Sequence, residues 1–241
     1  MTRLAGVIDA AVALADAVND IDAKVEFKAA RGSLLAGEVK YGEAQKVYDD
    51  AIAMAEKAGL KRAAATVLLY KAYVAGLLGR DTESLEMYFR AYQRFEAIGD
   101  ATAARATLGA IGGAYAHDGA SNESLLKALT FHERSIAPNA EKSARHELAT
   151  TYFNMAVVYQ RLKDWPKAKE YVTRSKNLFH ALDDNIGEAF CNYRLGVLSG
   201  ESGAWSEALA HQNAALPVLT GSGDTTMIFN VQRNRARALA R

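Results

Sequence analysis

The sequence contains two similar stretches that together predict the fold, YFNMAVVYQRLKDWPKAKEY at residues 152–171 and NYRLGVLSGESGAWSEALAH at residues 192–211. Sliding the first stretch by 40 positions superimposes residues of the same kind. The matched pairs are Trp165 with Trp205, Ala168 with Ala208, Met155 with Leu195 and Ala156 with Gly196. Self-similarity at a fixed period of this length is the signature of a repeat protein.

The pattern extends toward the N-terminus in three further copies. A step with four extra residues reaches residues 108–135, and two more steps of 40 reach the first copy. Three columns of small residues stay in register: Gly32, Ala72, Gly112, Ala156 and Gly196; Ala44, Ser84, Ala128, Ala168 and Ala208; and Ala51, Ala91, Ser135, Ser175 and Ala215. Small residues recur where two antiparallel helices cross closely. Three columns in register over five copies therefore predict repeated helix pairs.

The composition agrees with an all-helical chain and excludes several classes of protein. Of 241 residues, 50% are apolar and only three are proline, which excludes a disordered chain and favours helices. The single cysteine excludes an internal disulfide framework and any CxxC motif. A net charge of +1 supplies no global attraction to nucleic acid or to an anionic membrane.

These columns resemble the tetratricopeptide repeat, whose motif is W-x2-L-G-x2-Y followed by A-x3-F-x2-A. Residues 152–159 followed by 168–175 track the motif, and so do residues 108–115 followed by Ala128. The period of 40 departs from the usual 34 residues and is similar to that of bacterial regulators, including peptide-sensing quorum proteins, and of Pins-type adaptors. The resemblance covers about residues 25–226 and implies an all-α, right-handed α-solenoid of five helix pairs with a capping helix at each end.

We predict the repeats at residues 25–64, 65–104, 105–148, 149–188 and 189–226. Between them, Gly99-Asp100 and Asp183-Asp184 suit the end of one helix and the N-cap of the next. Residues 1–24 are expected to form the N-terminal capping helix. Its apolar stripe is Leu4, Ile8, Ala11, Ala15 and Val18.

Residues 227–241 are expected to form a C-terminal capping helix or the start of a further repeat. Ile228, Val231 and Leu239 would lie along its packed side. The same stretch carries four arginines, Arg233, Arg235, Arg237 and Arg241. They are either a basic contact to nucleic acid or an acidic partner, or, as we favour, cations suited to a helix C-terminus and to the polar outer side of a cap. The pattern is still running at Arg241, so a longer protein with an effector domain stays open.

No catalytic, metal or targeting signal stands out. The five histidines lack paired-ligand spacing, and His132 falls at the repeat position of Tyr48 and Tyr88, which indicates a packing histidine. Cys191 has no base beside it in sequence. The longest apolar stretch, residues 63–79, contains Lys71 and is shorter than the ~20 residues of a membrane span. We therefore expect no enzyme activity, no cofactor and no metal, and a cytoplasmic location.

A ligand is expected on the first helices of the repeats, which line the concave surface of a helical solenoid. The predicted groove residues are Leu69, Tyr73, Gly109, Gly113, Phe153, Asn154, Val157, Gln160, Arg161, Phe190, Tyr193 and Arg194. Glycines at the third repeat let a ligand backbone approach closely, while Asn154 and the arginines suit a peptide backbone and a carboxylate. Alternatively, the aromatic residues pack between repeats or against a neighbouring subunit.

The resemblance also bears on the ligand. Peptide-binding relatives use Asn or Arg at the positions of Asn154 and Arg194, but the lysines of the carboxylate clamp are replaced by Phe153 and Phe190. We therefore predict a non-catalytic interaction module that binds a peptide or extended protein segment and is the regulatory part of a larger signalling protein. The alternative is a self-association or small-ligand sensor module that forms a homodimer or binds an apolar ligand. Nucleic acid and membrane are not expected partners.

Overall fold

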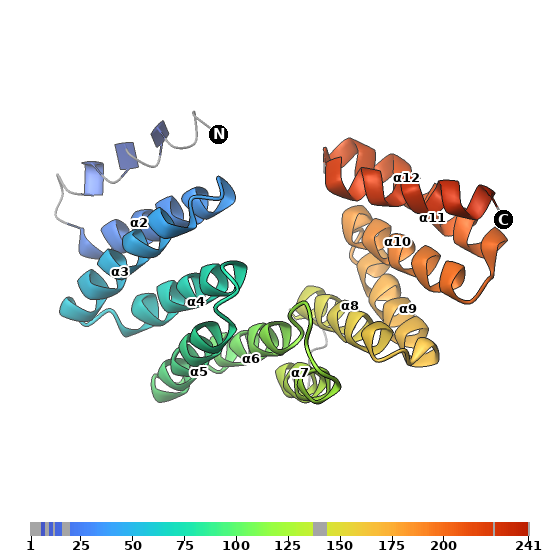
Figure 1. The fold of residues 1–241 in the computed structure, drawn as a ribbon. Helices are drawn as coiled ribbons and strands as arrows, with labels where there is room; N and C mark the ends of the chain where they lie inside the picture. The colour runs from blue at the N-terminus through green and yellow to red at the C-terminus, as the bar shows by residue number, and fades with distance from the viewer. Residues whose placement is uncertain are drawn as a thin grey trace. The chain divides into compact units, whose positions relative to one another are not determined.

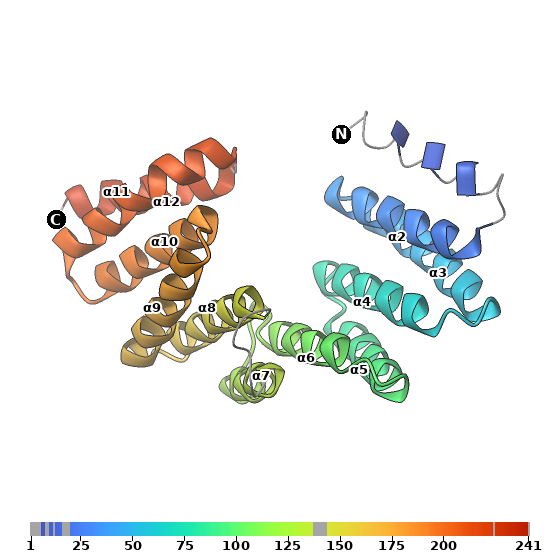
Figure 2. The same cartoon turned by 180° about the vertical axis from the view of Figure 1, so that it is seen from behind.

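A computed structural model describes residues 6–7, 10–11, 13–15, 20–136, 144–223 and 225–240 (Figures 1 and 2). Within these residues every regular element is a helix. The helices are α2 (Ile21–Gly37), α3 (Tyr41–Lys57), α4 (Lys61–Leu77), α5 (Asp81–Ala97), α6 (Ala101–Tyr115), α7 (Asn122–Ser135), α8 (Arg145–Arg161), α9 (Trp165–Ala181), α10 (Asn185–Glu201), α11 (Trp205–Ser222) and α12 (Thr225–Leu239). The all-α prediction is confirmed.

Short turns join α2 with α3, α4 with α5, α8 with α9, and α10 with α11 into packed pairs. Gly99 adopts positive φ after a helix, as predicted, and so do Gly59 and Gly223. The side chains of Asp100 and Asp184 then accept hydrogen bonds from backbone N–H groups in the first turn of the next helix. The first helices of these pairs begin at residues 21, 61, 145 and 185, and α6 begins at residue 101; each start lies four residues before a predicted repeat boundary.

The chain divides into two compact units, residues Met1–Gly119 and Ala120–Arg241. Unit 1 holds α2–α6 and unit 2 holds α7–α12. The division falls inside the predicted third repeat, residues 105–148, where the period is four residues longer than elsewhere.

The small residues of the repeat columns are buried where the helices of a pair cross. A Cβ added to Gly32 on α2 would lie 2.8 Å from Cζ of Tyr48 on α3. A Cβ added to Gly196 on α10 would lie 2.9 Å from the side-chain carbonyl carbon of Gln212 on α11. Carbon atoms pack best at about 3.5–4.0 Å, so close packing is the reason that these helices contain glycine.

The structure tests the predicted capping helices at the two ends of the chain only in part. The N-terminal capping helix rests on Leu4, Ile8 and Val18, which lie outside the described residues. On α12, Val231 is fully buried as predicted, but Leu239 is 64% exposed. The prediction that Leu239 shares the packed side is wrong, because eight residues of an α-helix turn about 80° beyond two full turns.

Candidate peptide-binding site

Eight of the twelve predicted groove residues lie in unit 2 on two first helices. Helix α8 carries Phe153, Asn154, Val157, Gln160 and Arg161, and helix α10 carries Phe190, Tyr193 and Arg194. All eight are half-buried. Residues three, four and seven apart share one face of a helix, so each set forms a stripe that is neither sealed in the core nor fully in solvent.

Arg194 connects the two helices. Its Nη1 donates a hydrogen bond of 3.0 Å to Oε1 of Gln160. Its guanidinium carbon lies 5.5 Å from the centre of the Phe153 ring and 5.8 Å from that of Tyr193, within the range of cation–π attraction. The structure therefore brings together four residues that the sequence analysis singled out separately.

The guanidinium of Arg194 has little compensation for its burial. Nε is buried and has no hydrogen-bond partner within the described residues, and none of their carboxylates forms an ion pair with this side chain. Burial lowers the pKa of Arg194, although an arginine stays protonated. A buried charge without a counter-ion is costly, so an acceptor supplied by a ligand would relieve an existing cost.

The other polar residues of this surface have different roles. Gln160 holds Arg194 in place, whereas Asn154 makes no side-chain hydrogen bond within the described residues. A free carboxamide both donates and accepts, which suits a peptide backbone. On α8, Val157 lies between Asn154 and Gln160, and Arg161 is the last residue of that helix.

Phe190 and Tyr193 are held from behind by the interior of unit 2. They pack against a buried apolar cluster of Ala189, Ala215, Leu219 and Val231. The alternative that aromatic residues pack between repeats therefore applies to part of each ring. Rings fixed in this way lose little conformational entropy when a ligand contacts their free edges.

Unit 1 carries the remaining four predicted residues. Leu69 and Tyr73 lie on α4, and Gly109 and Gly113 lie on α6. Tyr73 is 59% exposed, and a Cβ added to Gly113 would meet nothing within 4 Å. The approach of a ligand backbone to this part of α6 stays a prediction.

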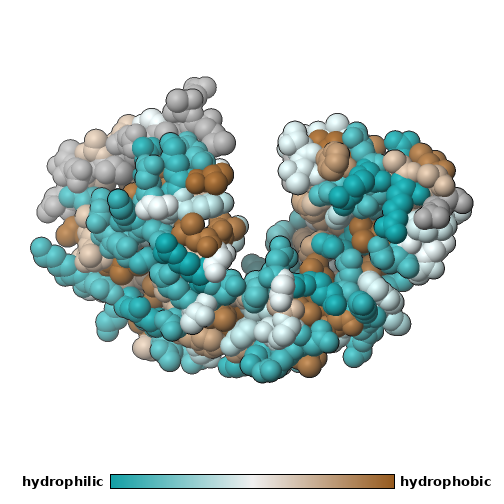
Figure 3. Space-filling view, viewed as in Figure 1, coloured by the Kyte–Doolittle hydropathy of each residue, from teal (hydrophilic) through white to brown (hydrophobic). Residues whose placement is uncertain are grey.

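Unit 1 also contains a cleft that the sequence analysis missed. It has a volume of about 590 Å³ and lies between α2 and α4. Small residues form much of its lining, including Ala29, Ala30 and Ala63, with Tyr70 beside them. Figure 3 shows hydrophobic patches among the hydrophilic surface over these helices. Small residues at adjacent positions of both first helices are the signal that would have revealed it.

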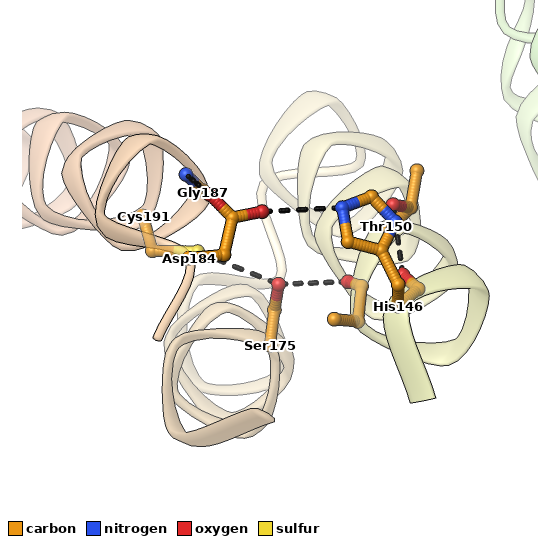
Figure 4. Close-up of polar contacts among 7 residues, drawn as sticks. His146, Thr150, Ser175, Asp184, Gly187 and Cys191 are labelled. Carbon is orange, nitrogen blue, oxygen red and sulfur yellow. Dashed lines mark hydrogen bonds and ion pairs between the residues drawn. The ribbon is translucent and has the colours of Figure 1, made fainter. Parts of the chain in front are cut away.

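A polar cluster where α8, α9 and α10 meet contains hydroxyl, thiol, imidazole and carboxylate groups (Figure 4). Asp184 accepts from the N–H of Gly187 at 2.8 Å and contacts Nε2 of His146 at 3.1 Å. Ser175 donates to a backbone carbonyl of α8 at 2.7 Å and accepts from Cys191 at 3.4 Å. Burial raises the pKa of Cys191 to about 11. These bonds cap a helix and tie helices together, and within the described residues neither the hydroxyl of Ser175 nor the thiol of Cys191 forms a hydrogen bond with an imidazole or a carboxylate.

Metal-binding clusters and membrane-spanning helices are both absent from the described residues. There, no three His, Cys, Asp or Glu side chains lie close enough together to hold a metal ion. No helix in that part of the chain is both long enough and apolar enough to cross a membrane.

Comparison with known proteins supports the repeat assignment. Residues 147–220 match the sequence profile of the tetratricopeptide repeat family. These residues span α8–α11, the helices that carry the Arg194 surface. The resemblance to tetratricopeptide repeats is therefore confirmed. No curated protein matches the sequence as a relative.

Solved structures share the fold at low sequence identity. BtubC (BKLC) from P. vanneervenii is 16% identical, with a TM-score of 0.74 over 92% of each chain. The apo form of the quorum sensor NprR from B. thuringiensis is 15% identical, with a TM-score of 0.70 over 97% of this chain and 65% of that one. NprR in complex with its cognate peptide NprX is 14% identical, with a TM-score of 0.71 over 95% and 67%. All three support a helical repeat fold.

Proposed function

We propose that unit 2 is an interaction module that binds a peptide or extended protein segment across α8 and α10. The observation that carries this proposal is the half-buried guanidinium of Arg194, which Gln160 orients and which has no carboxylate partner within the described residues. A carboxylate or carbonyl of the ligand would accept from its remaining N–H donors. The exposed edges of Phe153 and Tyr193 would contact apolar side chains of the ligand.

The fold comparisons agree with this function. NprR has been solved with its cognate peptide, and tetratricopeptide repeats are protein-interaction scaffolds. The regulatory role in a larger signalling protein, predicted from the sequence, is part of the same proposal.

The expected energetic contribution of Arg194 follows from its chemistry. A hydrogen bond to a charged group contributes about 1.5–3 kcal/mol, which corresponds to a roughly 10- to 150-fold change in Kd. Arg194→Met keeps much of the apolar stem but removes the charge and the donors. Since the stem continues to cover Phe153, folding is retained while affinity falls.

The test selects peptides from a random display library against the full chain and measures the Kd of each by fluorescence anisotropy. Arg194→Met is compared with Arg174→Met, which removes an exposed arginine on α9. We expect a loss of tenfold or more for the first variant and less than twofold for the second. Equal affinity for wild type and Arg194→Met, with circular dichroism unchanged, would refute the site.

A second candidate function has its own observation. The cleft of about 590 Å³ between α2 and α4 falls within the usual ~300–1,000 Å³ of small-molecule sites. This favours the alternative of a small-ligand sensor for unit 1. Ala30 is exposed and lines the cleft, so Ala30→Trp would fill it without disturbing the core. Native mass spectrometry should show a retained small molecule on wild type that is lost from this variant; wild type without one in fresh lysate would exclude the idea.

A further inference from the structure

The cleft of unit 1 has one acidic wall and one basic wall. Helices α2 and α4 lie side by side (Figures 1 and 2), and the cleft of about 590 Å³ lies between them. The charged residues of its lining are segregated, with Asp22 and Glu26 on α2 and with Lys61 and Arg62 on α4. All four are exposed, and within the described residues neither acid forms an ion pair with either cation. Opposite charges therefore line one space without neutralising each other.

The basic wall suits a carboxylate. At the N-termini of α2 and α6, the side chains of Asp20 and Asp100 each accept a hydrogen bond from a backbone N–H of the first turn. The N-cap of α4 is Leu60, which has no such acceptor, and no acidic residue lies in the first turn of that helix. Instead, Lys61 and Arg62 place two cations at the positive end of the helix dipole, which is unfavourable. An anion in the cleft would relieve this repulsion.

The rest of the cleft lining is uncharged and includes an aromatic wall. Ala30 and Ala63 lie beyond the charged residues along the two helices, and their short side chains leave room for a ligand. Tyr70 also lines the cleft and is 42% exposed. The centre of its ring lies 6.2 Å from that of the buried Tyr48. Because the interior of unit 1 supports this ring, contact with an apolar ligand costs little conformational entropy.

We propose that the cleft binds a zwitterionic small molecule of the amino-acid class, which has a free ammonium, a free carboxylate and an apolar or aromatic body. This inference rests on the small-ligand function proposed for unit 1, and it names the ligand class. The carboxylate lies at Lys61 and the ammonium at Glu26, while the body contacts Tyr70. A molecule with only one of these charges leaves the other wall without a partner, so both charges contribute to recognition.

Two sources carry this chemistry, a free amino acid and a dipeptide. A free amino acid has both charges on one carbon atom, whereas a further residue separates them by roughly 3.5 Å more. The probes are L-phenylalanine and the dipeptide alanyl-phenylalanine. Each is compared with its N-acetyl form, which lacks the ammonium, and with its carboxamide form, which lacks the carboxylate. The zwitterion that binds more tightly identifies the charge separation that the cleft accepts.

Isothermal titration calorimetry with the full chain tests the proposal. We expect the tighter zwitterion to bind at least tenfold more tightly than its N-acetyl and carboxamide forms, and to weaken as salt rises. Lys61→Met should weaken the zwitterion at least fivefold but leave the carboxamide form unchanged. Glu26→Gln should weaken the zwitterion at least fivefold but leave the N-acetyl form unchanged.

Matched control variants change charges outside the cleft. Lys46→Met on α3 and Glu86→Gln on α5 alter exposed side chains that are not part of its lining, so they should leave every affinity unchanged. Ala30→Trp, which fills the cleft, should abolish binding of the zwitterion. Circular dichroism checks that each variant folds.

Three results would overturn the proposal. The first is that neither zwitterion binds, and the second is that a singly charged form binds as tightly as its zwitterion. The third is that Lys61→Met and Glu26→Gln bind the zwitterion as tightly as the control variants do. Native mass spectrometry separates this failure from that of the small-ligand function. A retained molecule that lacks an ammonium or a carboxylate, and that Ala30→Trp loses, refutes the zwitterion but supports the small-ligand function.

Discussion

The packing of Gly32 against Tyr48 makes a quantitative prediction for Gly32→Ala. The added methyl would lie 2.8 Å from Cζ of Tyr48, so the ring must move by roughly 1 Å to reach ordinary contact. That ring is 1% exposed, and its hydroxyl is 3.1 Å from Oγ of Ser33. Overpacking of this kind costs about 1–3 kcal/mol, whereas replacing a mid-helix glycine by alanine gains about 0.5–1 kcal/mol.

The net expectation is a loss of up to about 2.5 kcal/mol in the free energy of unfolding. Gly113→Ala is the control in the same unit, because a Cβ there meets nothing within 4 Å. It should stabilise unit 1 by about 0.5–1 kcal/mol. Urea denaturation followed by far-UV circular dichroism measures both, and the two variants should shift the midpoint in opposite directions.

A second substitution separates the clash from other effects. The equivalent pair in α8 and α9 is Ala156 with Val172, so Tyr48→Val supplies the smaller partner. Tyr48→Val destabilises by itself, but in that background Gly32→Ala should become neutral or stabilising. If Gly32→Ala stabilised the wild-type protein as much as Gly113→Ala does, the packing explanation of the small-residue columns would be wrong.

Three other predictions concern buried polar groups. Burial lowers the pKa of His132 to about 4 from 6.5; the folded state therefore favours the neutral ring, and its stability falls as pH drops from about 6.5 to 4, by up to ~3 kcal/mol. His132→Phe should lack this part of the pH dependence in urea midpoints measured across that range, and an unchanged dependence would contradict the assignment. Cys191, fully buried with its pKa raised to about 11, should react with a thiol reagent near pH 7.5 only at the rate of unfolding; rapid labelling of the native protein would refute this. Ser175→Ala should cost about 1 kcal/mol because it removes the 2.7 Å bond to α8, whereas Thr173→Ala, at an exposed position, should cost less in the same urea assay.

The repeat columns were sufficient to predict the helix pairs that pack within each unit and the close crossings between their helices. Small residues at a fixed spacing report a local requirement, since each crossing involves two helices adjacent in sequence. The small-residue columns do not predict the residue at which each helix pair begins. They define the spacing of the repeats, but the helix boundaries depend on caps such as Asp100 and Asp184.

For the candidate site, too, the sequence predicted one part and the tertiary structure decided the rest. The sequence by itself determined that Phe153, Tyr193 and Arg194 lie away from the buried small-residue stripe of first helices, because helical periodicity assigns each residue to a face. Only the tertiary structure decided that Arg194 bonds to Gln160, 34 positions away, and has no counter-ion among the described residues. It also decided that Leu239 is exposed and that the chain forms two units. These features depend on which helices come to lie beside one another. A pattern within one helix does not show which side chains of other helices it will meet.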